Sequence, residues 1–94
     1  MGLFGKKQMI ILKDHLTEDE FKILNAEMDK AAQNMPDQAA TVYYSMGSSI
    51  RRGDEVEVKN CKKLCLAALS LNMKLRIAHE STPALYKKLE EVLK

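Results

Sequence analysis

The side chains with the most potential for chemistry in this 94-residue chain are two cysteines and two histidines. Cys61 and Cys65 are spaced by one helical turn, so in a helix both thiols would share one face. A tetrahedral metal site needs two further ligands, and His15 and His79 lie far from the cysteines in the sequence. The spacing also differs from the Cys-x-x-Cys pattern of redox-active thiols. We therefore expect buried, inert cysteines, with a metal site or a reactive thiol as the alternatives.

The histidines are the other groups that could act as an acid or a base. His15 follows Asp14 and His79 precedes Glu80, but neither pair has a nucleophile at the spacing of a catalytic motif. The sequence contains no glycine-rich phosphate loop, no His-Glu-x-x-His zinc motif and no Gly-x-Ser-x-Gly elbow. We therefore expect no catalytic activity, no cofactor and no small-molecule substrate.

Charge is divided unevenly along the chain, although the net charge is only +2. Residues 14–37 contain seven acids and two lysines, a sum of −5, whereas residues 38–79 contain seven bases and three acids, a sum of +4. Many of the bases would gather where a second helix ends and a third begins, which is typical of a surface that binds a phosphate backbone. Glu55 and Glu57 lie within this basic corner, so a solvated face or a surface for an acidic protein partner are the alternatives. The candidate nucleic-acid-binding residues of the basic corner are Arg51, Arg52, Lys59, Lys62 and Lys63.

Tyrosine and methionine side chains indicate a protein-binding surface. Tyr43 and Tyr44 are neighbours, so in a helix they would point to different faces and at least one ring would leave the core. Tyrosine is common at interfaces because its ring is apolar and its tip is polar, and the six methionines would add adaptable apolar surface. The candidate partner-binding residues are Tyr43, Tyr44, Met46, Gly47, Leu66 and Leu69.

Helices must position all of these residues, and the best-defined helix start is at Thr17. Thr17 and Glu20 have the spacing of a capping box, and Leu16 and Phe21 fall at the two positions of a hydrophobic staple. An apolar stripe at three- and four-residue spacing follows over four turns, until Pro36 ends the pattern. We therefore predict an amphipathic first helix between Thr17 and Pro36.

A second helix is predicted to begin at Asp37, directly after Pro36, and to end at Gly53. Gly47 lies inside it, so either another helix approaches closely there or the helix breaks. Together with Tyr43 and the later stretch 68–72, the two glycines resemble parts of a tetratricopeptide repeat. The spacing of the glycines departs from that family, and no second copy follows at its period, so we predict a helical hairpin without assigning the family.

A third helix is predicted to begin at Asp54, which has the capping-box spacing to Glu57. Residues 64–71 are apolar around the whole circumference except for Ser70, so this helix should be central and covered on more than one side. Residues 73–78 alternate like a strand or continue the helix, and a last amphipathic helix follows Pro83.

These elements predict an all-α fold, a compact bundle of about four helices with an αα-hairpin over 37–72 at its centre. A short extended segment is expected at 8–12 and/or 73–78. We expect residues 1–94 to form a single helical domain, with residues 1–7 as a flexible leader.

Composition narrows the class of protein further. An apolar fraction of 46% argues against disorder, two cysteines are too few for a disulfide scaffold, and no apolar run reaches the ~18 residues of a membrane span. We therefore expect a cytoplasmic interaction module, such as a regulator, adaptor or complex subunit. Self-association as a homodimer is expected because a chain of this size would struggle to cover residues 64–71. The alternative is a nucleic-acid-binding regulator that uses the basic corner.

Overall fold

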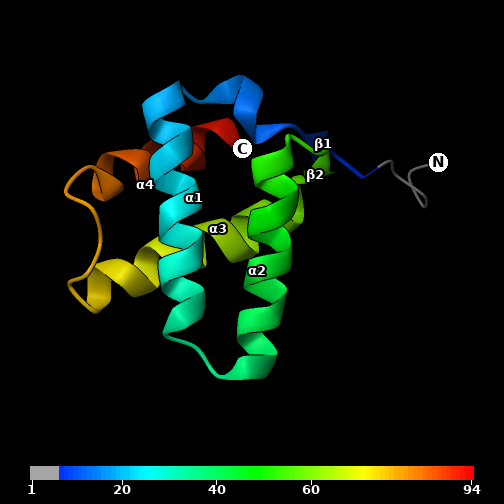
Figure 1. Cartoon of the computed structure of the whole chain (residues 1–94). Coiled ribbons are helices and arrows are strands. Elements are labelled where there is room, and N and C mark those ends of the chain that lie inside the picture. The colour runs from blue at the N-terminus through cyan, green and yellow to red at the C-terminus, as the bar shows by residue number, and fades with distance from the viewer. Residues whose placement is uncertain (1–6) are drawn as a thin grey trace.

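Four α-helices and one short antiparallel sheet make up residues 7–94, the part of the chain that the computed structural model describes (Figure 1). The predicted all-α bundle of about four helices is therefore confirmed, whereas most of the expected leader lies outside the described residues. The elements in chain order are β1 (Met9–Ile10), a short 3-10 turn η2 (Leu12–His15), α1 (Glu18–Gln33), α2 (Asp37–Arg52), β2 (Val56–Glu57), α3 (Val58–Lys74) and α4 (Thr82–Val92).

The predicted capping box opens α1. The Glu20 amide donates to Thr17 Oγ1 at 3.1 Å, and the Thr17 amide donates to Glu20 Oε1 at 2.8 Å. Such a cap contributes about 1 kcal/mol to helix stability because it satisfies amides that have no partner within the helix. The helix ends at Gln33, shortly before Pro36, as the sequence pattern predicts.

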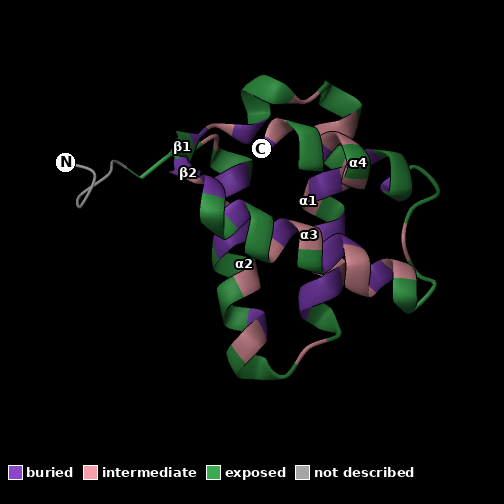
Figure 2. Ribbon diagram, turned by 180° about the vertical axis from the view of Figure 1, so that it is seen from behind, coloured by how far each residue is buried: buried purple, intermediate pink, exposed green. Residues whose placement is uncertain are grey.

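The core lies where α1 meets the other helices (Figure 2). α1 packs against both α2 and α3, and α3 also packs against α4, whereas direct packing between α2 and α3 is slight. The two helices predicted to form a hairpin over 37–72 therefore both pack against α1 and make little contact with each other. The largest apolar side chains that are at most 2% exposed are Leu12, Leu24, Met28, Ile50, Leu69, Leu89 and Leu93.

α2 runs unbroken from Asp37 through Gly47 to Arg52, so the predicted break at this glycine does not occur. A β-carbon at Gly47 would lie 3.6 Å from the β-carbon of Met28, which is ordinary contact with α1. The alternative prediction, a close approach of another helix, describes the site better. Gly53 then ends α2 in the left-handed conformation, at φ 79°.

The start of α3 differs from the prediction. Residues 56–57 are extended and pair with β1, with Ile10 opposite Val56, and α3 begins only at Val58 without a side-chain cap. The Asp54 carboxylate instead accepts hydrogen bonds from the Arg52 guanidinium. Of the expected extended segment at 8–12, Met9–Ile10 forms a strand that pairs with the chain just before α3, whereas Leu12 already belongs to η2.

Residues 73–78 form no strand. α3 continues to Lys74, and the chain then turns sharply at Arg76, which has a left-handed φ of 60°. The Arg76 amide donates to Met73 O at 3.1 Å and the Ile77 amide donates to Asn72 O at 3.0 Å, which is the Schellman pattern of helix ends. None of the helices within residues 7–94 is long and apolar enough to span a membrane.

Candidate functional site

An open groove of about 540 Å³ lies between α2 and α3 and is closed at one end by the β1–β2 ladder. Its apolar lining residues are Met9 from β1, Val42 and Met46 from α2, Val56 from β2 and Leu64 from α3. The groove exists because α2 and α3 both pack on α1 and leave a gap between themselves. We call this feature the α2–α3 groove.

Two of the groove side chains are unusually exposed for their type. Met9 is 44% exposed and Val42 is 50% exposed, whereas Met46 and Val56 form a buried floor. Glu55 and Glu57 are the charged residues of the lining, and Glu57 Oε1 pairs with Lys7 Nζ at 3.2 Å. The groove is therefore apolar at its base and acidic at its rim, which suits an apolar segment with positive charge beside it.

The predicted partner-binding residues are scattered over the structure. Met46 lines the groove, but Tyr43 packs against the core and Gly47 faces α1. Tyr44 is 42% exposed on α2 and lies outside the groove.

The two predicted residues of α3 do not meet the groove either. Leu66 lies in a separate shallow depression between α3 and α4. Leu69 is completely buried within the chain and offers no surface to a partner.

Sequence reasoning missed Met9 and Val42. Val42 belongs to the periodic apolar face of α2, and periodicity alone cannot distinguish the edge of such a face from its buried centre. The apolar stretch 64–71 is largely covered, because Ala68 and Leu69 are buried and Leu64, Leu66 and Leu71 pack against the core. The chain therefore largely covers this stretch without a partner, contrary to the expectation from its sequence.

The basic corner is partly neutralised by neighbouring acids. Arg51 pairs with Asp29 of α1 at 3.1 Å, and Arg52 pairs with Asp54 at 2.8 Å. Lys59, Lys62 and Lys63 are exposed on α3 and make no ion pair with any residue in 7–94. α3 contains four lysines and no acid, so its outer face stays positively charged, whereas the two arginines are paired with acids.

The cysteines lie in the core as expected. Cys61 and Cys65 are both free and completely buried. A hydrogen bond shared with Cys61, together with burial, raises the pKa of the Cys65 thiol well above its usual range. Among residues 7–94 no group of three or more His, Cys, Asp or Glu side chains is placed to hold a metal ion. The same hydrogen bond lowers the pKa of the Cys61 thiol, against the effect of its burial. The Cys65 thiol is therefore a poor nucleophile, and both sulfurs are shielded from water by the core.

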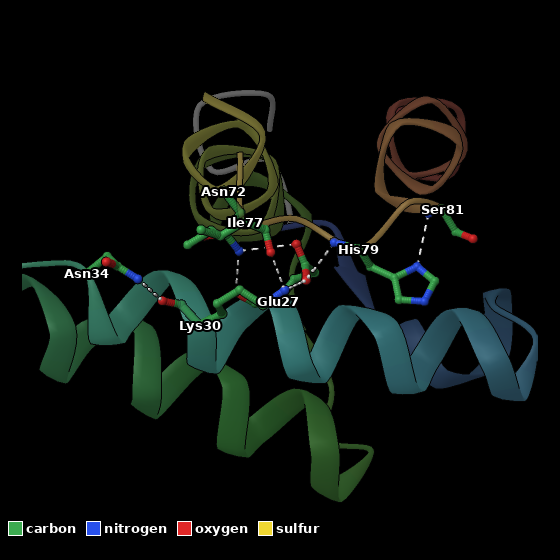
Figure 3. A network of polar contacts seen from close by, with 7 residues as sticks. All are labelled: Glu27, Lys30, Asn34, Asn72, Ile77, His79 and Ser81. Carbon is green, nitrogen blue, oxygen red and sulfur yellow. Dashed lines mark hydrogen bonds and ion pairs between the residues drawn. The ribbon is translucent and has the colours of Figure 1, made fainter. Parts of the chain in front are cut away.

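A second polar feature is a buried network that joins α1 to the end of α3 (Figure 3). The Glu27 side chain is 1% exposed, and its Oε1 accepts from Asn72 Nδ2 at 3.2 Å. Asn72 Nδ2 also donates to the Glu27 carbonyl at 2.9 Å. Glu27 Oε2 accepts from Lys30 Nζ at 2.7 Å, so the buried carboxylate has an opposite charge beside it.

The same network fixes the turn between α3 and α4. Lys30 Nζ donates to the Ile77 carbonyl at 2.7 Å, and the His79 amide reaches Glu27 Oε2 at 3.4 Å. The His79 ring points away from Glu27, and its Nδ1 accepts from the Ser81 amide at 3.0 Å (Figure 3). These hydrogen bonds tie the turn between α3 and α4 to α1.

Comparison with family models, with curated proteins and with solved structures finds no match for this chain. No name or activity can therefore be transferred from a relative.

Proposed function

We propose that this protein is a small helical interaction module that self-associates through the α2–α3 groove and has no catalytic activity of its own. The single observation that supports this proposal best is that Met9 and Val42, each about half exposed, both line the groove above its buried floor. Exposed apolar side chains gathered in a concave surface are typical of protein-binding sites. Two free, buried cysteines fit a reducing compartment, so we propose a cytoplasmic location.

The expected affinity is low. Complete burial of a valine or methionine side chain contributes roughly 1.5–3 kcal/mol, so side chains that are half exposed add about 1 kcal/mol each when a partner covers them. Association also loses translational and rotational freedom, which costs at least about 4 kcal/mol. A contact built on a few such side chains is therefore expected in the micromolar range or weaker.

Sedimentation velocity over a wide concentration range tests the proposal. We expect the weight-average mass of the wild type to rise with concentration, and Val42→Glu to prevent the rise. Tyr44→Glu is the matched control, because it introduces the same charge at an exposed apolar residue of α2 outside the groove. A wild type that stays monomeric up to about 1 mM would refute self-association. Equal losses in both variants would refute the groove.

Nucleic-acid binding is the second candidate function, and the lysines of α3 favour it. Lys59, Lys62 and Lys63 are exposed on a helix without acids, which is the arrangement expected for phosphate contacts. Fluorescence anisotropy with a labelled duplex at several salt concentrations tests this candidate. Affinity that falls with salt, and falls further when the three lysines are changed to glutamine, would support it. Anisotropy that does not change when protein is added at low salt would exclude nucleic-acid binding. Lys87→Gln on α4 serves as the control variant.

A further inference from the structure

The turn between α3 and α4 presents a second exposed apolar surface. Leu75 is 46% exposed and Ile77 is 38% exposed, on either side of Arg76. The exposed large apolar side chains of residues 7–94 fall into two groups and one single residue. Met9 and Val42 line the α2–α3 groove, Leu75 and Ile77 lie on this turn, and Tyr44 lies elsewhere on α2. The two surfaces therefore carry most of the exposed large apolar side chains of the described chain.

This turn is held rigidly. The Schellman hydrogen bonds fix Arg76 and Ile77, and the Ile77 carbonyl accepts from Lys30 of α1 at 2.7 Å. The exposure of Leu75 and Ile77 is therefore part of the folded structure and does not result from a loose loop. A preorganised apolar projection loses little conformational freedom when it binds.

The charges of the turn and of the groove are complementary. Lys74 and Arg76 are exposed beside the apolar residues of the turn, and neither makes an ion pair within the described chain. Glu55 and Glu57 supply the charge of the groove lining, and only Glu57 has a basic partner within residues 7–94. An apolar projection with basic neighbours therefore matches an apolar groove with acidic neighbours.

One molecule cannot fill its own groove with its own turn. The turn lies at the end of the bundle opposite the β1–β2 ladder, as both ribbon views show (Figures 1 and 2). α3 separates the two ends, and a helix of 17 residues is about 25 Å long. The turn is available only to the groove of another molecule.

We propose that the occupant of the α2–α3 groove is the α3–α4 turn of a second copy of this chain. The inference rests on the proposed self-association and names the two different surfaces that meet. Such a contact is heterologous, because a turn meets a groove and not its own counterpart. Repetition of the contact produces either a reciprocal dimer or a longer assembly.

A complementation experiment tests this inference by sedimentation velocity. The groove variant is Val42→Glu and the turn variant is Ile77→Glu, and each alone should lose association by at least about tenfold. Mixed at equal concentrations, the two variants should associate again, because one supplies an intact turn and the other an intact groove. Tyr44→Glu is the control that should associate like the wild type. Circular dichroism confirms folding, and Met9→Glu and Leu75→Glu replace any variant that does not fold.

Three outcomes would overturn the inference. If Ile77→Glu and Leu75→Glu associate as the wild type does while Val42→Glu does not, the groove binds another groove, and the proposed function survives without the inference. If the mixture of groove and turn variants stays monomeric, the contact does not join a turn to a groove. A wild type that is monomeric throughout would refute both the inference and the self-association on which it rests.

Discussion

Replacing Arg76 by glycine should stabilise this protein. Arg76 occupies the left-handed position of a Schellman motif at φ 60°, and Gly53 occupies the same position at the end of α2 at φ 79°. The left-handed conformation costs a residue with a β-carbon roughly 1–2 kcal/mol. Glycine removes this cost but adds about 0.4–1 kcal/mol of entropy to the unfolded chain. The net expectation for Arg76→Gly is a gain of about 0.5–1 kcal/mol in the free energy of unfolding.

The reverse substitution, Gly53→Ala, provides a matched comparison. A β-carbon at Gly53 would meet its nearest atom, Lys13 Cδ, at 3.8 Å, so the substitution adds conformational cost without a steric clash. We expect Gly53→Ala to lower the free energy of unfolding by about 0.5–1 kcal/mol, and the double variant to lie close to the wild type because the sites are distant.

Urea unfolding followed by circular dichroism measures these differences, with an unchanged m-value as the check on two-state behaviour. In a domain of this size the melting temperature should move by about 2–8 °C in each direction. Arg76→Gly that unfolds more easily than the wild type would refute the reasoning. The exposed arginine side chain would then have to stabilise the fold by more than its backbone strain costs.

Three further predictions concern the core, acid stability and α2. Asn72→Ala removes the buried amide that donates to the Glu27 carbonyl and carboxylate, so we expect the free energy of unfolding, measured in urea, to fall by about 2–4 kcal/mol. A fall below about 1 kcal/mol would show that water replaces the amide at little cost. Lys88 and the Thr17 amide donate hydrogen bonds to the Glu20 carboxylate and lower its pKa. The ionised carboxylate therefore stabilises the folded state. This stabilisation is complete above the usual glutamate pKa of about 4.3 and is lost as the pH falls through the lower pKa of the folded state. Lys88→Met should therefore reduce the difference in stability between pH 7 and pH 3, and an unchanged difference would contradict the assignment. Gly47→Ala should raise stability by up to about 1 kcal/mol, since a β-carbon there meets α1 only at ordinary contact distance; a loss of stability would mean that α1 and α2 cannot accept the methyl group.

Local sequence patterns predicted the helices well because the determinants of helix ends are local. Thr17 and Glu20 are three residues apart, and their reciprocal hydrogen bonds form as the spacing requires. Pro36 and Gly53 mark the ends of helices through backbone geometry alone. These features need no tertiary contact to be recognised.

The start of α3 was mispredicted because a distant segment decides it. Asp54 and Glu57 have a valid capping-box spacing, but Val56 and Glu57 pair with β1 and delay the helix to Val58. Strand pairing across more than forty residues cannot be inferred from a local pattern when each strand has only two residues. The tertiary contact overrides the local preference at this point.

The candidate site was harder to predict than the fold for a similar reason. Val42 and Met46 belong to one apolar face of α2, and only the packing of α2 on α1 leaves Val42 exposed and Met46 buried. The fully buried Leu69 looked equally suitable for a partner in the sequence. A groove depends on which helices do not pack together, and periodicity contains no information about that choice.

The central claim is that this protein self-associates through the α2–α3 groove, and the most direct measurement is the concentration dependence of backbone amide shifts by NMR. Between about 20 µM and about 1 mM, we predict progressive shifts at Val42, at Met9 and at Ile77 of the turn, while amides of α4 stay constant. Shifts that are absent over this range would contradict the account. Shifts confined to the side of α2 that bears Tyr44 would also contradict it.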